Sequence, residues 1–306
     1  AKAFKANPDY LPKLLSGDPK FTVDAISFNT ELSDFGGYEY NDKLYFVSAR
    51  NKSRRNYGWN DQPTLDVYVA TKENGEYQNP EELKGEVNSK YHEGTVSITP
   101  DGKTMFFTRN NYLDGDYEKS SEGIGKLKIY KANLVNGKWD DVQELPFNSD
   151  EYSTGHTALS PDGKTLYFSS DMPGGMGMSD LYKVSINEDG SFGEPENLGS
   201  SINTEARESF PYIDSEGTLY FSSDGQLGIG GLDVFYAKAD GDGFSSVKNM
   251  GQPINSTGDD FAFTFNINEE SGFVSSNRSG IEETVANDNI YRVMQIQPLD
   301  EIIVNS

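Results

Sequence analysis

The chain has 306 residues, of which 49 are acidic and 26 are lysine or arginine, so its formal net charge is −23. Nucleic acids and anionic membrane surfaces are recognised through basic patches, so this balance argues against both as partners. The chain contains no cysteine, which excludes disulfide bonds, a thiol nucleophile and a cysteine-ligated zinc ion.

The first segment, residues 1–20, is predicted to be a helical or linker segment, because residues 3–12 read as the end of a helix followed by a break at Pro12. Residues 21–29 have the pattern of a strand and resemble residues 139–148 further along the chain. We expect this strand to pair with the last repeat of the chain and close a ring; the alternative is a disordered arm.

A short apolar strand core recurs five times from residue 44 onward, at intervals of roughly 50–60 residues. Its copies are Leu44-Tyr45-Phe46, Met105-Phe106-Phe107, Leu166-Tyr167-Phe168, Leu219-Tyr220-Phe221 and Gly272-Phe273-Val274. A second core follows each copy: Asp66-Val67-Tyr68, Lys128-Ile129-Tyr130, Asp180-Leu181-Tyr182, Asp233-Val234-Phe235 and Asn289-Ile290-Tyr291. Asn-Gly and Asp-Gly turns flank these cores and supply the positive φ that tight hairpins require.

Each repeat therefore reads as four short antiparallel strands, A to D. Packing such sheets in a ring buries both of their apolar faces and leaves few free edges, which is the architecture of a β-propeller. The sequence predicts an all-β, five-bladed propeller over residues 21–293, closed by the N-terminal strand. Residues 294–306 are predicted to be a linker, an extra strand or the start of a following domain.

Two of the repeats carry a recognisable motif. Ser160-Pro161-Asp162-Gly163-Lys164 and Thr99-Pro100-Asp101-Gly102-Lys103, each followed by its apolar core, resemble the repeat of WD40-like (PD40, TolB-type) propellers. The Gly-rich stretch Gly174-Gly175-Met176-Gly177 is similar to repeats in OmpA-family periplasmic proteins of Bacteroidota. This resemblance implies a periplasmic, outer-membrane-associated protein in which peptidoglycan is bound only by a separate domain absent from this chain.

The loops between strands B and C are long in the first two repeats, and long loops on a rigid scaffold are common binding sites. The first of these loops carries Arg50, Arg54, Arg55, Tyr57 and Trp59, and the second carries Tyr112 and Tyr117. Exposed Trp, Tyr and Arg side chains are typical of interface anchors. We expect a partner-binding surface here; the alternative is a solvated loop with its tryptophan folded onto a blade.

The starts of the A strands converge on the central channel of a propeller. Polar residues near these starts are Asp34, Glu93, His156, Glu208, Asp259 and Asp260. A ring of oxygens at a channel mouth suits a hard cation such as Ca²⁺, although a hydrated, self-neutralised rim is the alternative. We find no continuous metal motif and expect no cofactor; Asp114-Gly115-Asp116 lacks the remaining ligands of a calcium loop.

Two Gly-rich stretches, residues 174–177 and 225–231, invite comparison with phosphate-binding loops. A phosphate cradle needs a helix N-terminus after it. Each stretch leads instead into a predicted strand, so we expect tight B–C connections.

A binding function is expected rather than catalysis. There is no Gly-x-Ser-x-Gly nucleophile elbow, and only His92 and His156 are available as imidazole bases. With the resemblance above, this predicts a non-catalytic interaction scaffold for a periplasmic protein partner, in a complex such as the type IX secretion machinery. The alternatives are a sensor that binds a glycan, small ligand or cation through the channel, and a glycoside hydrolase-like enzyme.

Overall fold

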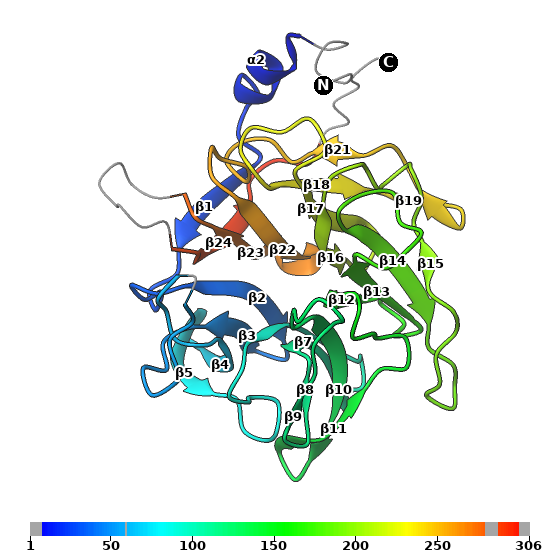
Figure 1. Cartoon of the computed structure of the whole chain (residues 1–306). Coiled ribbons are helices and arrows are strands. Elements are labelled where there is room, and N and C mark those ends of the chain that lie inside the picture. Colours follow the sequence, from blue (N-terminus) through cyan, green and yellow to red (C-terminus); the bar gives the residue numbers. More distant parts are fainter. Residues whose placement is uncertain (1–7, 59, 279–286, 300–306) are drawn as a thin grey trace.

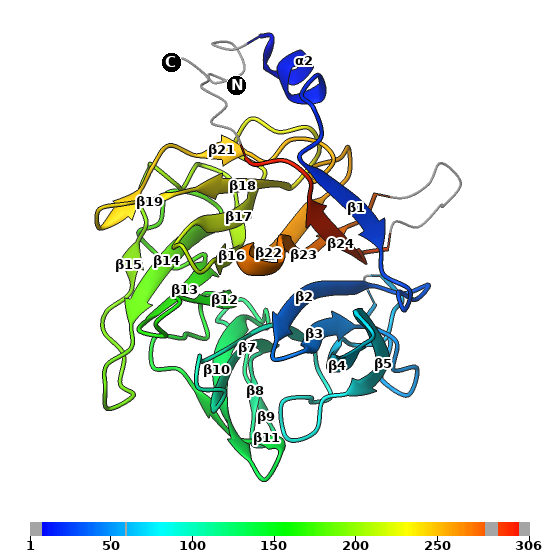
Figure 2. The same cartoon turned by 180° about the vertical axis from the view of Figure 1, so that it is seen from behind.

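The computed structural model describes residues 8–58, 60–278 and 287–299, and these form five four-stranded antiparallel sheets arranged around one axis (Figure 1). The view from behind shows the same ring, with the inner strands β2, β12, β16 and β22 turned toward its centre (Figure 2). The expected five-bladed propeller is therefore confirmed.

The first two blades have their strands in chain order from the axis outward. Blade one contains β2 (Asp34–Tyr40), β3 (Lys43–Ser48), β4 (Asp66–Glu73) and β5 (Glu76–Glu82). Blade two contains β6 (Glu93–Ile98), β7 (Thr104–Asn110), β10 (Leu127–Val135) and β11 (Lys138–Glu144). The B–C loop of blade two carries a small hairpin of its own, β8 (Tyr112–Leu113) with β9 (Asp116–Tyr117).

The next two blades repeat this order. Blade three contains β12 (Thr154–Leu159), β13 (Thr165–Ser170), β14 (Asp180–Ser185) and β15 (Glu196–Asn197). Blade four contains β16 (Glu208–Ile213), β17 (Leu219–Ser223), β18 (Asp233–Ala237) and β21 (Lys248–Asn249). A two-stranded ribbon, β19 (Ala239–Asp240) with β20 (Gly243–Phe244), precedes β21.

Blade five closes the ring with strands from both ends of the chain. It contains β22 (Asp260–Asn266), β23 (Ser271–Ser276) and β24 (Asn289–Gln295), with β1 (Phe21–Ala25) as its outermost strand. β1 pairs antiparallel with β24, from Phe21 opposite Gln295 to Ala25 opposite Tyr291. The predicted closure by the N-terminal strand is confirmed, and β24 runs past Val293, where the propeller was expected to end.

Two short helical segments complete the described elements. α2 (Tyr10–Leu15) precedes β1, and a 3₁₀ turn, η1 (Ile267–Glu269), connects β22 to β23. None of the described helices has the length and apolar character needed to cross a membrane.

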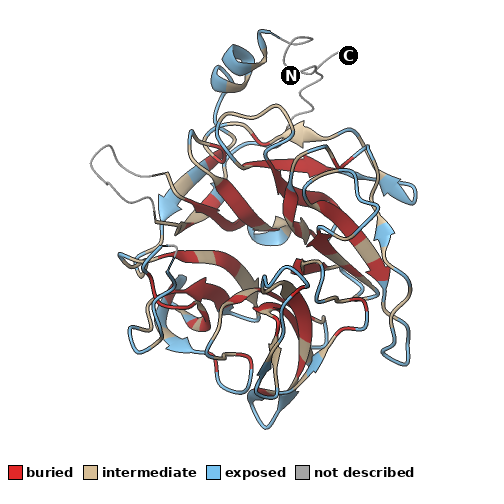
Figure 3. Ribbon diagram, viewed as in Figure 1, coloured by how far each residue is buried: buried red, intermediate tan, exposed pale blue. Residues whose placement is uncertain are grey.

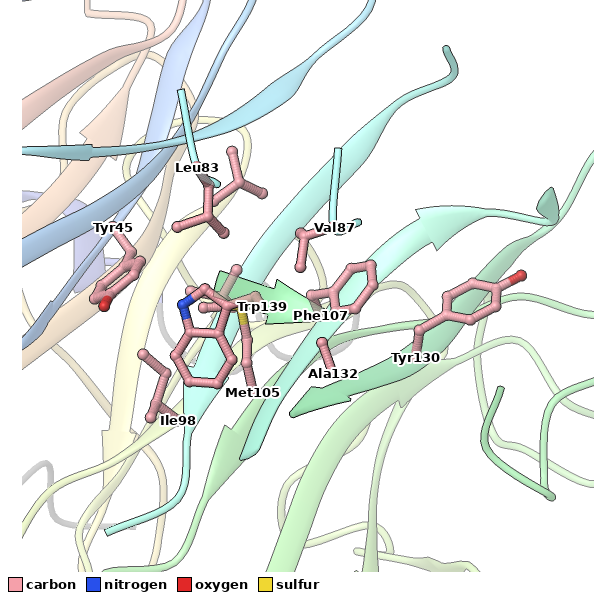
Figure 4. Packing of buried hydrophobic residues seen from close by; sticks show 11 residues of the cluster. Tyr45, Leu83, Val87, Ile98, Met105, Phe107, Tyr130, Ala132 and Trp139 are labelled. Carbon is pink, nitrogen blue, oxygen red and sulfur yellow. The ribbon is translucent and has the colours of Figure 1, made fainter. Parts of the chain in front are cut away.

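The hydrophobic core lies between neighbouring blades, where the buried strands face one another (Figure 3). Between blades one and two, Trp139 packs with Tyr45, Met105 and Ile98 (Figure 4). Between blades four and five, Phe21 of the closing strand packs edge-on against Phe263 and Phe265. The closing strand thus adds its own side chain to the core.

An asparagine ties the entry of every blade to the preceding outer strands. Each of the five accepts a hydrogen bond from one backbone N–H at the start of a C strand and donates to the carbonyl of the same residue. The five pairs are Asn29 with Ile290, Asn88 with Val67, Asn148 with Ile129, Asn203 with Leu181 and Asn255 with Val234. This two-way bond satisfies backbone groups that the short D strands leave unpaired.

Each inner strand carries a β-bulge near its start. The register shifts lie between Phe35 and Tyr38, Glu93 and Val96, Gly155 and Ala158, Ser209 and Tyr212, and Phe261 and Thr264. A bulge bends its strand and re-aims one side chain. Five equivalent bulges around one axis therefore shape the centre of the propeller.

Candidate functional site

A hollow of about 300 Å³ lies on the propeller axis. All five blades line it, mostly through the later residues of the A strands and the turns that follow them. The lining residues used below are Gly36, Tyr38, Glu39, Tyr40, Thr95, Phe210, Tyr212, Asp214, Ser215, Ala262 and Phe263. We call this hollow the axial pocket. It lies toward the A–B turns, at the end of the axis opposite the starts of the A strands.

Aromatic side chains lie around the axis below the axial pocket. The imidazole of His156 stacks on Phe210, Phe210 contacts Phe261, and Phe261 contacts Phe35, with ring centroids 3.8, 4.9 and 5.8 Å apart. These four side chains come from the inner strands of the successive blades three, four, five and one, so they form an arc of contacts between neighbouring blades.

The backbone at the bulges of the inner strands is strained. His156, Phe210 and Ala262 have φ values of 55°, 49° and 50°, in the left-handed region that side chains with a Cβ rarely adopt. Gly36 occupies the equivalent position of blade one with φ 71°. Clustered outliers of this kind are found at functional sites more often than elsewhere, because the surrounding structure must hold them.

Three tyrosines form the wall of the axial pocket and link it to neighbouring blades. Tyr38 and Tyr40 donate hydrogen bonds to the carbonyl oxygens of Ile98 and Pro100, and Tyr212 donates to that of Phe265. Burial raises the pKa of Tyr38 to about 12. The wall is thus aromatic, and its hydroxyl groups are bonded to the backbone of neighbouring blades.

The charged residues in the lining are both carboxylates. Glu39 is paired with Lys72, at 3.2 Å from Nζ to Oε1. Asp214 is 1% exposed and accepts hydrogen bonds from the N–H groups of Glu216 and Thr218 and from the Tyr220 hydroxyl. No described lysine or arginine forms an ion pair with Asp214.

The lining also contains an unused hydroxyl. Thr95 is 9% exposed, and its Oγ1 has no hydrogen-bond partner among the described residues. Buried hydroxyls are normally bonded, so an unpartnered one in a cavity lining is available to a ligand or to ordered water.

The acidic residues expected at the channel mouth lie at the other end of the axis and hold blades together internally. Asp34, Glu93, Glu208 and Asp260 are at most 1% exposed. Each accepts a hydrogen bond from a serine or threonine four residues earlier, as Thr30 donates to Asp34. Each also bonds the end of its own B strand: Asp34 with Arg50, Glu93 with Arg109, Glu208 with Ser223 and Asp260 with Arg278.

Most of these contacts engage carboxylate oxygens within the blades, but Glu93 Oε2 has no hydrogen-bond partner among the described residues. Burial raises the pKa of Glu93 to about 8, against the opposing influence of Arg109. Asp259 accepts a hydrogen bond from the N–H of Leu232. His156 stacks on the ring of Phe210. The described residues include no group of three or more His, Asp or Glu side chains placed to hold a metal ion.

Two of the three arginines expected to anchor a partner turn toward the blades. The side chain of Arg50 is 15% exposed, bonds Asp34 at 2.7 Å and lies over the rings of Phe46 and Tyr68. That of Arg54 is 22% exposed and lies 2.8 Å from Asp66, which is fully buried. These positive charges neutralise buried aspartates and are not displayed to a partner.

The remaining members of the expected surface lie near one another. Tyr117 stacks on Tyr91 with centroids 4.4 Å apart, and Tyr112 contacts the same ring. Tyr57 is 50% exposed and meets His92 edge-on. Arg55 is exposed, and Trp59 lies outside the described residues. A partner contact at these tyrosines stays a prediction.

The Gly-rich stretches connect strands, as predicted. The N–H groups of Met176 and Gly177 donate to Asp180, and those of Ile229 and Gly230 donate to Asp233. A Cβ on Gly177 would lie 2.4 Å from the carbonyl oxygen of Ala206. Glycine is required there because the loop passes against the backbone of the next blade.

No protein-family model matches the sequence, and no curated protein matches it. Among solved structures, a puromycin hydrolase is 14% identical with a TM-score of 0.44, over 86% of this chain and 46% of that chain. This chain therefore spans less than half of the hydrolase. The calcium-binding protein regucalcin from Agrobacterium tumefaciens is 15% identical (TM-score 0.46; 85% and 74% covered). An α-L-arabinofuranosidase from Lactobacillus brevis is 12% identical (TM-score 0.49; 93% and 92% covered).

The predicted function, a scaffold of a secretion complex, is wrong. Two of the three arginines that motivated the partner surface, Arg50 and Arg54, are instead tied to buried aspartates. The alternative, a sensor working through the central channel, fits no better, because the acidic side chains expected at the channel mouth are bonded within the blades. What the topology shows is that the chain is a five-bladed β-propeller of four-stranded antiparallel blades.

Proposed function

We propose that this propeller is a non-catalytic receptor domain that holds one compact molecule in the axial pocket. The observation that carries the proposal is the pocket itself: about 300 Å³, lined by all five blades and floored by strained residues. Sites for small molecules are concave, mostly apolar and furnished with a few placed polar groups, with volumes from roughly 300 Å³ upward.

The lining supports binding rather than chemistry. Of the described residues that form it, none is a histidine, lysine or arginine. Tyr38, Tyr40 and Tyr212 use their hydroxyls to bond backbone carbonyls. Asp214 accepts hydrogen bonds from two N–H groups of its own turn and from the Tyr220 hydroxyl. A general base needs a free atom within hydrogen-bond reach of the substrate, and these groups are already engaged.

The test is to cover the axial pocket from its rim. Ser215 is exposed and lines the mouth, so Ser215→Trp places a large ring over it without disturbing the core. Glu216→Trp adds the same ring at the next exposed position of that turn, outside the lining. A small-molecule collection is screened by thermal shift against both variants and the parent chain, with hits measured by calorimetry.

The proposal expects hits that bind the parent and Glu216→Trp equally and lose at least tenfold in affinity with Ser215→Trp. Hits that bind all three proteins equally would place the binding site elsewhere. The absence of any saturable hit would remove the axial pocket as a receptor site.

We also propose that the chain is a WD40-like propeller domain of an OmpA-family periplasmic protein of Bacteroidota. Its support is the Pro-Asp-Gly-Lys motif of two blades together with the Gly-rich connections. The segment Asn7-Pro8 resembles the end of a helical repeat in PorE, an OmpA-family protein of the type IX secretion system. Only Pro8 of this segment is described, and the proposal does not include secretion. A periplasmic location and a protein partner at Tyr57, Tyr112 and Tyr117 depend on this assignment. Cell fractionation that leaves the protein in the cytoplasm would refute it.

A further inference from the structure

We infer that the molecule held in the axial pocket is a compact organic ammonium ion. This inference rests on the proposed receptor function and names the chemical class of its ligand. Three independent observations carry it: the aromatic wall, the sign of the charges in the lining and the unused hydroxyl of Thr95.

The aromatic wall suits a cation. The rings of Tyr38, Tyr40 and Tyr212, together with Phe210 and Phe263, line the axial pocket. A cation placed over the face of such a ring is attracted by its quadrupole, more strongly where water is excluded.

The negative charges of the lining also favour a cationic ligand. Asp214 is buried, and its hydrogen-bond donors are the neutral N–H groups of Glu216 and Thr218 and the Tyr220 hydroxyl. Buried carboxylates usually have a cationic partner. No described side chain provides one, so a ligand cation in the axial pocket would be the counter-charge that Asp214 lacks. Glu39 adds a second carboxylate at the rim, partly offset by Lys72.

The third observation indicates a polar end on the ligand. Thr95 Oγ1 is buried in the lining without a hydrogen-bond partner. An ammonium ion that carries a hydroxyl or an N–H group would satisfy this oxygen. An anion is disfavoured, because the lining offers it no positive side chain and the whole chain carries a net charge of −23.

The test compares a cation with its neutral isostere. Choline and 3,3-dimethylbutan-1-ol have nearly the same shape, and only choline carries a charge. Binding of each is measured by calorimetry to the parent chain, to Asp214→Asn and to Asp162→Asn. Asp162 is the matched control, because it accepts bonds in the equivalent turn of blade three but is exposed and outside the lining.

The inference expects choline to bind the parent and Asp162→Asn at least tenfold more tightly than the isostere, and Asp214→Asn to lose this preference. Thermal unfolding shows whether Asp214→Asn remains folded; if it does not, Tyr212→Leu replaces it and is expected to weaken choline more than the isostere. Equal binding of the two probes, or binding of neutral compounds alone, would overturn the ammonium class and leave the receptor function standing. If no compound binds the parent chain in a way that Ser215→Trp weakens, both the ammonium class and the receptor function are overturned.

Discussion

The imidazole of His156 lies flat on the ring of Phe210, with centroids 3.8 Å apart and ring planes 14° from parallel. Both residues sit in the left-handed backbone region, each at the bulge of its own inner strand. The two bulges therefore bring side chains of the neighbouring blades three and four into contact. Phe210 also lines the axial pocket, so this contact joins two blades at the lining of the pocket.

Acid should destabilise the protein partly through His156. Burial lowers the pKa of His156 to about 4, below its ordinary value of 6.5. A histidine with a lowered pKa in the folded state stabilises the fold fully above pH 6.5 and loses that contribution as the pH falls toward 4. His156→Asn keeps a residue that tolerates positive φ but does not titrate.

The stability advantage of the parent over His156→Asn should therefore shrink by about 2 kcal/mol between pH 7 and pH 4, less than the full shift would give because the ring is not wholly buried. Urea unfolding at intervals across this range measures it. A difference that stays constant with pH would show that His156 is protonated in the folded protein as easily as in the unfolded one.

The left-handed positions of the inner strands should respond oppositely to glycine and alanine. Gly36→Ala should destabilise the protein by about 1–3 kcal/mol, because φ is 71° and the new Cβ would lie 2.7 Å from Thr95 Cγ2. Ala262→Gly relieves the same kind of strain and should be neutral or stabilising by up to about 1 kcal/mol. Chemical denaturation of both variants is the measurement; a clearly destabilised Ala262→Gly would contradict the assignment of strain.

Closure of the ring should depend strongly on Phe21. Its side chain is 2% exposed and packs edge-on against Phe263 and Phe265, so Phe21→Ala should cost about 3–5 kcal/mol of unfolding free energy. Thr22→Ala, at the neighbouring exposed position of β1, is the control and should change stability by less than about 0.5 kcal/mol. If both variants unfold at the same urea concentration as the parent, β1 is not part of the cooperative fold.

Adjacent arginines in the first B–C loop should behave differently. Arg54→Ala leaves the buried carboxylate of Asp66 without its cation and should cost about 2–3 kcal/mol. Arg55→Ala removes an exposed side chain and should change stability by less than about 0.5 kcal/mol. Thermal unfolding measured at low and high salt checks the pair. Equal effects would mean that Arg54 is displayed to solvent, as the loop composition first indicated.

The repeated strand cores were sufficient to predict the blades and their closure, because apolar alternation and Asn-Gly or Asp-Gly turns act locally. The five asparagines that tie the blades together were also visible in the sequence, each five or six residues before the start of an A strand. An asparagine in a loop does not by itself indicate which backbone groups it bonds. The bulges were not predictable: the residues at the shared position have no side-chain type in common, being Gly36, Thr95, His156, Phe210 and Ala262.

The direction of the loop arginines also required the structure. Composition identified Arg50 and Arg54 as unusual in an acidic chain, but not whether they meet solvent or a buried aspartate. The axial pocket could not be predicted from the sequence either. It is built from short A–B turns that look purely structural one at a time, and it exists only where five of them meet.

The pairing of β1 with β24 has a mechanical consequence. Phe21 lies opposite Gln295, and the N–H of Ile296 donates to the carbonyl oxygen of Lys20, so the chain enters and leaves the disc at the same point. Tension applied through residues 20 and 296 would load the hydrogen bonds of this seam one after another, as in unzipping, rather than all at once in shear. The propeller would then peel open at blade five under small forces while its other four blades stayed intact.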